Sequence, residues 1–469
     1  MAFFRSLALL AGILTLASAS VSRANDDEIV LSRIVFGSCA HQDRPQPIWK
    51  AITASNPDIF LFLGDNIYAD TKEIDKLKAT YDKFAAHPEF AEFKKKCKRC
   101  MATWDDHDYG WNDAGEEYPL KEQSQQLFLD FFGYPADSPL RKQKGVYNAR
   151  IFGPEGKRVQ IIMLDTRYFR SPLRKALDGF GYMANNDPKA TILGEEQWRW
   201  LESELRKPAD LRIIGSSIQL VAEDHPFEKW MNIPAERERF FKLIRNTKAK
   251  GVVVISGDRH LAELSVMDAK IGYPLFDLTS SGINQATNSW RPLEKNQHRV
   301  ATMNVGNNFG LLLLDWERPA EKGGPSLTFQ IRDTDNEVTI SHTIPLTLLK
   351  VGKVIDPDST VKLEAGVIAP AEAAEQVGKK VTVQMPVRSV GKSGPRVFLN
   401  SKPNFRDEGN FAIVVQKEAL DQYQAKNIDP SDYFRNKIIQ VTGTVTLYRD
   451  SPQIEVRDAE QIRVVGGKE

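Results

Sequence analysis

The sequence predicts an α/β protein that carries a smaller all-β module towards its C-terminal end. Three observations support this prediction. Up to about residue 260, short apolar runs typical of buried strands alternate with amphipathic helical stretches, which indicates α/β layers. From about residue 275, further strand-like runs follow one another without helices between them. Beyond about residue 376, alternating strands return with one short helix among them.

The first twenty residues have the pattern of a secretory signal peptide. Arg5 gives the positive start, residues 7–17 form a mostly apolar stretch, and Ala17-Ser18-Ala19 is a cleavage signal. The apolar stretch is too short to span a bilayer, and no later stretch is long enough to do so. We therefore expect residues 1–24 to be a leader and the protein to be exported, to the periplasm or outside the cell. An N-terminal membrane anchor is the alternative interpretation.

Residues 25–350 are expected to form the main domain, which alternates strands and helices before it ends in strands alone. Strands are predicted over residues 29–36, 58–63, 159–165, 211–217 and 251–258. Helices are predicted over residues 47–55, 116–132, 194–206 and 235–248. The later strands, which suggest a second sheet, are predicted over residues 275–280, 310–315, 327–332 and 338–344.

The C-terminal part is predicted to begin after a linker. Residues 351–376 contain Pro357, Pro370 and an Ala- and Glu-rich segment, which is typical of a linker. Residues 377–469 then contain five strand candidates with a helix between the third and the fourth, which is the element order of an OB-fold barrel. The strands are expected at residues 379–387, 396–400, 410–416, 436–448 and 452–456, and the helix at 417–426.

Composition and charge exclude several classes of protein. The 469 residues are 41% hydrophobic and 27% charged, so the chain is neither disordered throughout nor collagen-like. A net charge of +1 argues against a protein held to nucleic acid by bulk charge. Three cysteines are too few for a disulfide scaffold. In an oxidising compartment we expect Cys97 and Cys100 to pair, which leaves Cys39 as the odd thiol. The alternatives are a reduced pair or zinc ligands, although a structural zinc site needs four ligands and the sequence has no second CxxC.

Polar clusters follow several predicted strands, at the edge of the sheet where α/β proteins bind ligands. The first is Gly37-Ser38-Cys39, in which a thiolate could bind a metal or a small cysteine could simply pack in the core. The second is GDNIYAD at residues 64–70, in which Asp65 and Tyr68 can reach one hard cation such as Fe³⁺. The alternative there is a turn whose residues merely suit the backbone.

The third and fourth clusters are richer in acids. ATWDDHDYGWNDAG at residues 102–115 brings four carboxylates together, and these repel one another unless a cation compensates their charge. The aromatic residues in the same segment favour a walled polar site over a solvated loop. SGDRHLAE at residues 256–263 places Asp258 and His260 two positions apart, on one side of an extended segment.

Together the four clusters supply ligands for a dinuclear metal centre. The candidates are Cys39, Asp65, Tyr68, Asp106, Asp258 and His260. Neither a G-x-S-x-G nucleophile elbow nor a G-x-x-x-x-G-K-[ST] phosphate loop occurs in the sequence. Catalysis by a Ser/His/Asp triad and P-loop chemistry are therefore poorly supported.

These motifs resemble those of a known family. GDNIY fits the G-D-x-x-Y motif of calcineurin-like metallophosphatases that hold Fe³⁺. The combination of GSC, LGDNIYAD, WDDHDYGWNDAG and GDRH resembles the alkaline phosphatase D family more closely, over about residues 30 to 345. The resemblance implies a four-layer αββα metallophosphatase sandwich and the hydrolysis of phosphoesters at a site with Fe³⁺ and Ca²⁺.

The resemblance also implies roles for individual residues. Asp65 would bridge two metals, Tyr68 would bind the Fe³⁺, and Cys39 would be an iron ligand where related phosphatases use an Asp. Asp106 stands where the usual G-N-H motif has its Asn, and His107 stands where that motif has its catalytic His.

Further positions match the family pattern less closely. Asp258 and His260 match the closing metal-binding element, with Asp258 in place of a His. The usual His in the middle of the chain is missing, and Gln219 is a weak substitute. Oxygen in place of nitrogen disfavours zinc and favours Ca²⁺ at the second position. Asn112 is a candidate further ligand, and Arg167 is either a phosphate contact or a salt-bridged residue.

We therefore expect an exported, metal-dependent phosphoester hydrolase of the alkaline phosphatase or phosphodiesterase type. Its substrate would be a small phosphoester or a phosphodiester polymer, and His107 would protonate the leaving group. The alternative is an envelope-associated binding protein whose C-terminal barrel binds an oligonucleotide or a glycan. Binding of nucleic acid requires stacking aromatics in a basic groove, whereas the aromatics of this barrel are mostly core or loop residues.

Overall fold

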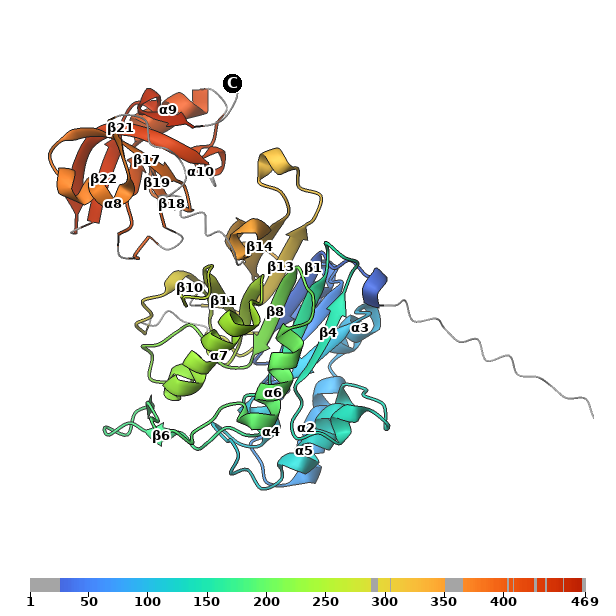
Figure 1. Cartoon of the computed structure of the whole chain (residues 1–469). Coiled ribbons are helices and arrows are strands. Elements are labelled where there is room, and N and C mark those ends of the chain that lie inside the picture. The colour runs from blue at the N-terminus through green and yellow to red at the C-terminus, as the bar shows by residue number, and fades with distance from the viewer. Residues whose placement is uncertain are drawn as a thin grey trace, which may run out of the picture.

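The computed structural model describes residues 26–287, 294–303, 305–350 and 366–465, apart from residues 403–404, 408, 426–427, 435–436 and 450. The predicted leader and residues 351–365 of the predicted linker lie outside the described residues. Within the described part of the main region, two β-sheets pack face to face and helices cover both outer faces (Figure 1). The α/β class and the four-layer αββα arrangement are thus confirmed.

The first sheet has the strand order β15-β14-β13-β1-β2-β3. Its first three strands along the chain are parallel, and Val35 lies opposite both Phe60 and Leu311 in the register. Aromatic side chains of four helices, such as Trp49 and Phe93 with ring centroids 4.8 Å apart, pack on its outer face. The strands are β1 (Arg33–Gly37), β2 (Ile59–Leu63), β3 (Cys100–Thr103), β13 (Phe309–Asp315), β14 (Ser326–Arg332) and β15 (Val338–Pro345). The helices are α1 (Ile48–Ala54), α2 (Ile74–Ala85), α3 (Pro88–Lys96) and α5 (Lys121–Phe131).

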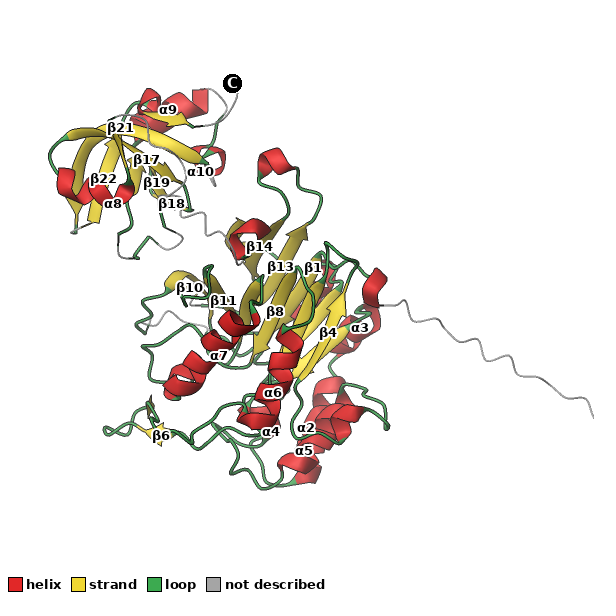
Figure 2. Ribbon diagram, viewed as in Figure 1, coloured by secondary structure: helices red, strands yellow, loops and turns green. Residues whose placement is uncertain are grey.

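The second sheet has the strand order β12-β10-β11-β9-β8-β5-β4. Its central strands are parallel, and the helices α6 (Gly194–Leu205) and α7 (Pro234–Thr247) cover its outer face (Figure 2). The inner faces of the two sheets share one apolar core, to which Leu61, Ile214 and Phe329 belong. The strands are β4 (Asn148–Phe152), β5 (Val159–Met163), β8 (Leu211–Ser216), β9 (Val252–Ser256), β10 (Ala262–Met267), β11 (Leu275–Ser280) and β12 (Arg299–Met303).

Local sequence explains where several elements begin and end. All five residues of β2 are buried, as its continuous apolar run predicts for a strand covered on both faces. The helix α7 begins with a proline, whose missing N–H costs nothing at the first position of a helix. It ends at Lys248, which adopts the left-handed conformation that commonly stops a helix.

Two expectations need correction. The predicted helix over residues 116–132 is confirmed only from Lys121, because residues 116–120 form a turn in front of α5. The expected disulfide is wrong, because Cys97 and Cys100 are both free thiols. Cys97 Sγ lies 3.1 Å from the carbonyl oxygen of Arg99, to which it donates a hydrogen bond, while Cys100 opens β3.

The C-terminal module is all-β except for short helices. Its strand order is β16-β17-β21-β22-β20-β19-β18, with β23 beside β21, and it has an apolar core of its own. Its β16 pairs with β17, so residues 366–376 of the predicted linker already contain ordered elements. The strands are β16 (Val367–Ile368), β17 (Lys380–Pro386), β18 (Ser389–Ser393), β19 (Arg396–Asn400), β20 (Ala412–Val415), β21 (Ile438–Tyr448), β22 (Ser451–Val456) and β23 (Ile462–Val464). The helices are α8 (Pro370–Ala373), α9 (Lys417–Ala425) and α10 (Pro430–Tyr433).

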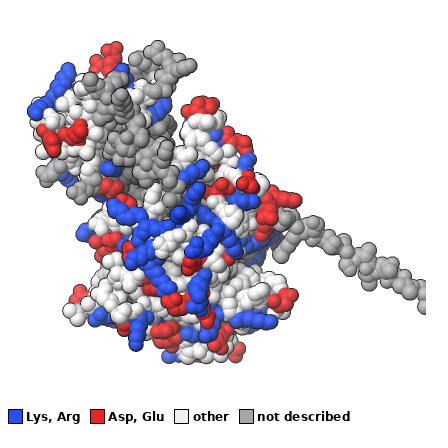
Figure 3. Space-filling model, in the orientation of Figure 1, with Lys and Arg blue, Asp and Glu red and all other residues white. Residues whose placement is uncertain are grey.

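The described residues contain no helix that is long and apolar enough to cross a membrane. On the face shown in Figure 3, Lys and Arg side chains gather over α6 and α7, with acidic side chains among them. Several of these charges form exposed pairs, such as Arg206 with Glu202 and Arg239 with Glu195. This face therefore presents both signs of charge to its surroundings.

Candidate metal centre

The predicted ligands meet at one edge of the two sheets because each follows the end of a strand. Cys39 follows β1 and Asp65 follows β2, while Asp105 and Asp106 follow β3, the third parallel strand. Asp258 follows β9 of the second sheet. The two sheets touch at this edge, where the Ser38 hydroxyl donates a hydrogen bond of 3.3 Å to the carbonyl oxygen of Ser280. The topology thus brings together side chains from opposite ends of the sequence.

The backbone of these loops adopts an uncommon conformation. Cys39, Asp65, Asp258 and His260 all have positive φ angles, at 63°, 48°, 68° and 54°. Non-glycine residues rarely adopt this conformation, and it persists only where the surrounding structure enforces it. Four such residues at one edge are therefore a mark of a functional site rather than of ordinary turns.

One group of donors combines sulfur, oxygen and nitrogen. The ligand atoms of Cys39, Asp65 and His260 all lie within 4.8 Å of one another. The Asp65 Oδ2 atom is 3.3 Å from Cys39 Sγ and accepts a 3.0 Å hydrogen bond from the Tyr68 hydroxyl, which is 3.1 Å from His260 Nε2. Burial and the charge of Asp65 raise the pKa values of the Cys39 thiol and the Tyr68 phenol. A cation between them would replace the protons that these groups otherwise keep.

A second group consists of carboxylates. Asp65, Asp105, Asp106 and Asp258 each offer an oxygen within 4.8 Å of the others. One buried oxygen of Asp65, of Asp105 and of Asp106 has no hydrogen-bond partner among the described residues. Burial raises the pKa of Asp65 to about 7, and burial with the charge of Asp106 raises the pKa of Asp258 well above its usual range. Buried acceptors without donors and crowded acids fit a bound cation, so this donor set suits a metal ion.

His107 stands at the mouth of the site in a defined orientation. The short helix α4 (Asp106–Tyr109) presents it, and its Nδ1 lies 2.8 Å from Asp70 Oδ1. Its other ring nitrogen, Nε2, is 4.0 Å from Asp106 Oδ2. Burial alone would lower the pKa of His107, but the charges of Asp106, Asp65 and Asp70 raise it to about 11. In the metal-free site these carboxylates therefore favour the protonated imidazole.

Arg167 is fully buried among carboxylates. Its Nε donates to Asp105 Oδ1 at 2.6 Å, and its Nη1 donates to Glu228 Oε2 at 2.5 Å. Glu228 in turn lies 3.0 Å from Arg170 Nε, and the Ser217 hydroxyl donates to Asp105 Oδ1 at 2.5 Å. Of the two interpretations of Arg167, the structure therefore favours the salt-bridged one over the phosphate contact.

The Asp108 carboxylate holds the loop that contains Asp65 by accepting hydrogen bonds from main-chain N–H groups. It accepts hydrogen bonds from the main-chain N–H of Asp105 at 2.7 Å and of Asp65 at 3.2 Å. It also accepts a 2.6 Å bond from the side-chain amide of Asn66. These bonds pin the carboxylate-bearing turns after β2 and β3 to each other, and that contact gives the two turns their relative position.

Two candidate ligands are not brought into the cluster. The Asn112 side chain is exposed and donates a 2.6 Å hydrogen bond to Asp113. Gln219 is buried but donates to Glu263 Oε1 at 2.6 Å and to Thr279 Oγ1 at 2.8 Å instead. Both residues lie in the right segments of the chain, but their side chains are engaged elsewhere.

Four residues that shape the site are not among the predicted ligands. Asp105 and Asp108 sit within the WDDHD run and Asp70 ends GDNIYAD, so the density of acids was a usable signal for them. Glu228 lies outside these motifs, far along the chain, and reaches the site through Arg167 and Arg170.

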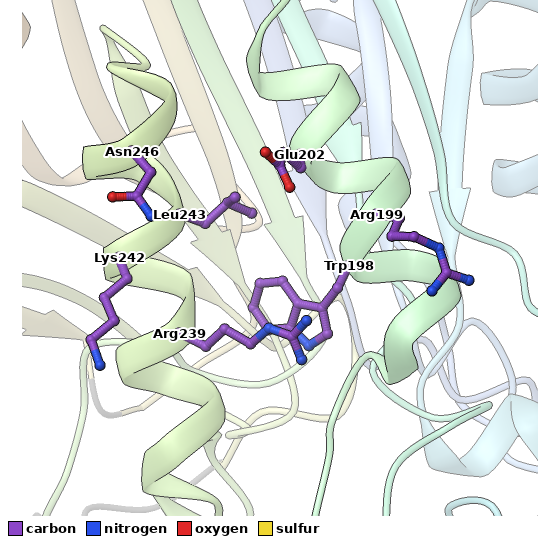
Figure 4. Close-up of a pocket in the computed structure, with 7 residues that line it drawn as sticks. All are labelled: Trp198, Arg199, Glu202, Arg239, Lys242, Leu243 and Asn246. Atoms are coloured by element: carbon purple, nitrogen blue, oxygen red, sulfur yellow. The ribbon is translucent and has the colours of Figure 1, made fainter.

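The chain also has a groove outside the metal centre. A space of about 270 Å³ lies between α6 and α7 (Figure 4). Its lining includes the aliphatic side chain of Leu243 and the charged groups of Arg199, Arg239 and Lys242. None of its lining residues is a predicted ligand, so the groove is separate from the site built at the strand ends.

A buried acid-rich group thus lies at the common edge of two facing sheets, and sequence comparison assigns the chain to a family of phosphatases. The family model of the PhoD-like phosphatases matches residues 34–308, so the chain belongs to the PhoD-like phosphatase family. This confirms the resemblance drawn from the motifs.

Individual relatives agree with this assignment. The chain is similar to alkaline phosphatase D of Bacillus subtilis (strain 168), with 24% identity over 301 residues, which are 53% of this chain and 48% of the relative. It therefore spans about half the length of that curated relative. A solved structure described as that of PhoD has a TM-score of 0.53 and 17% identity, covering 71% of this chain and 76% of its own.

Proposed function

We propose that this protein is a metal-dependent phosphoester hydrolase that acts at the edge where β1, β2, β3 and β9 end. The observation that carries the proposal is the buried group of Asp65, Asp105, Asp106 and Asp258, whose crowded oxygens lack enough donors. Membership of the PhoD-like phosphatase family supports phosphoesters as the substrate class. Monoesters and diesters, whether small molecules or polymers, are both compatible with these ligands.

The residues would divide between two metal positions. Cys39, Tyr68 and His260 would hold the first, Asp106 and Asp258 would hold the second, and Asp65 would be shared because it belongs to both groups. Bound metal ions would supply the Lewis acidity that lowers the pKa of a water and stabilises charge on phosphoryl oxygens. A thiolate and a phenolate favour Fe³⁺ at the first position, and carboxylates favour Ca²⁺ at the second.

The remaining steps belong to residues of this chain. Asp70 binds His107 Nδ1 and so leaves its Nε2 directed to the site, where it would protonate the departing alkoxide. The Nε and Nη1 atoms of Arg167 already donate to Asp105 and Glu228. We infer that Arg167 acts by holding Asp105 in place and by offsetting part of the negative charge.

The test is hydrolysis of p-nitrophenyl phosphate and bis-p-nitrophenyl phosphate by protein with measured metal content. We expect turnover of at least one of the two by the metal-loaded protein, and loss of that turnover in a chelated sample with recovery on adding metals back. Full turnover in a sample shown to be free of metal would overturn the proposal. The ratio of the two rates identifies the preferred ester class.

Metal identity has its own readout. Iron held by a phenolate absorbs visible light through charge transfer, so we expect a coloured sample when Fe³⁺ is loaded. Tyr68→Phe should abolish that band, whereas Tyr182→Phe, which changes a tyrosine that donates to Asp113, should keep it. A band that survives in Tyr68→Phe would exclude Tyr68 as the ligand.

We further propose that the protein is exported and that residues 366–465 form an OB-like barrel. The signal-peptide pattern of residues 1–24 supports export, and its test is the N-terminal sequence of the secreted protein. The barrel is supported by the strand order, because β17 and β18 stand near opposite ends of it yet are consecutive along the chain. An electrophoretic shift with the isolated module and single-stranded oligonucleotides tests whether it binds nucleic acid.

A further inference from the structure

A short β-hairpin lies between β5 and α6 along the chain. It carries the most exposed large apolar side chains among the described residues. It consists of β6 (Arg174–Lys175) and β7 (Tyr182–Met183), with Arg174 opposite Met183 in the register. At its tip, the side chain of Leu177 is 98% exposed and that of Phe180 is 62% exposed. Figure 1 shows β6 projecting from the body of the molecule at the end where α4 lies. Water therefore surrounds two large apolar groups on a protruding loop, which requires an explanation.

Hydrogen bonds connect the hairpin to the segment that carries Asp106. The N–H of Tyr182 donates to the carbonyl oxygen of Pro226 at 2.7 Å, and the Tyr182 hydroxyl donates to the side chain of Asp113. The N–H of Asp113 in turn donates to Asp106 Oδ2 at 2.6 Å. The Phe180 ring also contacts Phe227, with centroids 5.8 Å apart. The tip thus stands in a defined position relative to the carboxylates.

Basic side chains flank the apolar tip. Arg174 and Lys175 are both exposed, and neither has a carboxylate partner in the described part of the chain. The Lys175 ammonium group instead donates to the Tyr182 hydroxyl at 2.7 Å. Asp178 is the one acid in the turn, and its carboxylate accepts a hydrogen bond from the Phe180 N–H at 3.0 Å.

We propose that this hairpin docks the protein onto an anionic phospholipid surface, with Leu177 and Phe180 inserted among the acyl chains and Arg174 and Lys175 at the headgroups. A tip with two large apolar groups is too small for a stable protein interface, which buries about 800 Å² per partner. The same groups suffice for reversible attachment to a bilayer, where a few apolar side chains act together with basic ones. Attachment here would turn the metal-bearing edge towards the headgroups.

The experiment is cosedimentation with vesicles of phosphatidylglycerol and phosphatidylcholine, and with vesicles of phosphatidylcholine alone. It uses the full chain and a chain that begins at Asp26, because the apolar leader could itself bind vesicles. We expect the chain that begins at Asp26 to bind the anionic vesicles, and to bind less as salt is raised. The double variant Leu177→Asp with Phe180→Asp should have an affinity for the anionic vesicles that is lower by about tenfold or more.

The matched control changes another exposed apolar pair, Leu447→Asp with Tyr448→Asp, whose side chains are 51% and 59% exposed on the C-terminal module. We expect this variant to bind vesicles like the unchanged protein. Equal binding by the hairpin variant and the control, or no binding of anionic vesicles by the chain that begins at Asp26, would overturn the proposal. Hydrolysis of soluble p-nitrophenyl esters should stay unchanged in both variants, so this result is independent of the proposed enzyme activity.

Discussion

At the scale of single residues, His107 combines a fixed ring with a raised pKa. Because its Nδ1 is bound to Asp70, the proton on Nε2 is the one available for transfer. In the metal-free site the charges of the surrounding carboxylates raise the pKa of this ring to about 11. A general acid must hold its proton until the substrate arrives, and the fixed ring directs that proton towards the site.

We therefore expect His107→Gln to lower turnover of esters with poor leaving groups by about 10²- to 10⁴-fold. The loss should be much smaller for p-nitrophenyl esters, because p-nitrophenolate leaves without help from a proton. Rates on a series of esters with graded leaving groups measure this. His298→Gln, which alters a histidine 3.3 Å from Glu223, is the control. An equal loss across the series would contradict the role in protonation.

Glu228 is a second residue with a measurable role. It shares its charge between Arg167 and Arg170, and all three side chains are buried. Glu228→Gln removes the carboxylate that pairs with buried Arg170 and one of those that pair with Arg167, so we expect the free energy of unfolding to fall by about 3–5 kcal/mol.

Urea denaturation checks the prediction for Glu228. The control is Glu202→Gln, which breaks an exposed pair with Arg206 and should cost about 0–1 kcal/mol. If the two variants were equally stable, the buried network would not contribute as the distances suggest.

The acids of the site also predict a dependence of stability on pH. Burial raises the pKa of Asp65 to about 7 and that of Asp108 to about 8. A carboxyl group with a raised pKa binds its proton more tightly in the folded protein than in the unfolded chain. The metal-free protein should therefore lose stability as pH rises from about 4 to about 8.

Denaturation of the chelated protein at pH 5 and pH 8 measures this loss. Added metal should stabilise the protein more at pH 8, because fewer protons then compete for the carboxylates. Asp65→Asn should flatten the dependence on pH of the metal-free protein. Stability that rises over this range in the metal-free protein would contradict the prediction.

At the scale of elements, the turns after the strands position the ligands more than the strands themselves do. Gly64 lies between β2 and Asp65 with a φ angle of 97°. A Cβ atom at this position would lie 2.5 Å from the Cβ atom of Asp105. Only glycine lets the two acid-bearing turns approach this closely.

We expect Gly64→Ala to lower both stability and metal content, because it separates the turns after β2 and β3. The matched control is Gly133→Ala, since Gly133 also has a positive φ angle, 74°, but no atom lies within 4 Å of the added Cβ. The difference between the two variants isolates the contact from the backbone strain. Metal analysis of both proteins measures it, and equal metal content would show that the turns tolerate separation.

At the scale of the whole molecule, the sequence predicts the layers better than it predicts the site. Apolar runs such as the one that forms β2 identify buried strands, because a strand covered on both faces has apolar residues at every position. The helices α2 and α3, at residues 74–96, were not predicted, although the buried Leu77, Tyr81 and Phe84 of α2 recur at helical spacing. The short strand β18 was not predicted because Val390 is the one apolar residue in its sequence SVGKS.

The site was predictable where its residues cluster along the chain and not where they meet only in space. Asp65, Asp106 and His107 lie in dense polar motifs at strand ends, and the structure brings them together. Glu228 reaches Arg167 because the loop after β8 returns to the edge of the sheets. The position of that loop cannot be predicted from a motif. Side-chain direction within a loop, as for Asn112, likewise follows from contacts that no motif encodes.

Asp65 belongs to both donor groups, and this sharing has a thermodynamic consequence. Binding of a cation at one position changes the charge that the Asp65 carboxylate presents at the other position. A cation at either position removes the proton that Asp65 otherwise keeps, and the ionised group then attracts a cation at the neighbouring position. Linkage requires the effect to be equal in both directions. The two positions are therefore expected to fill cooperatively, so that partly loaded protein is scarce.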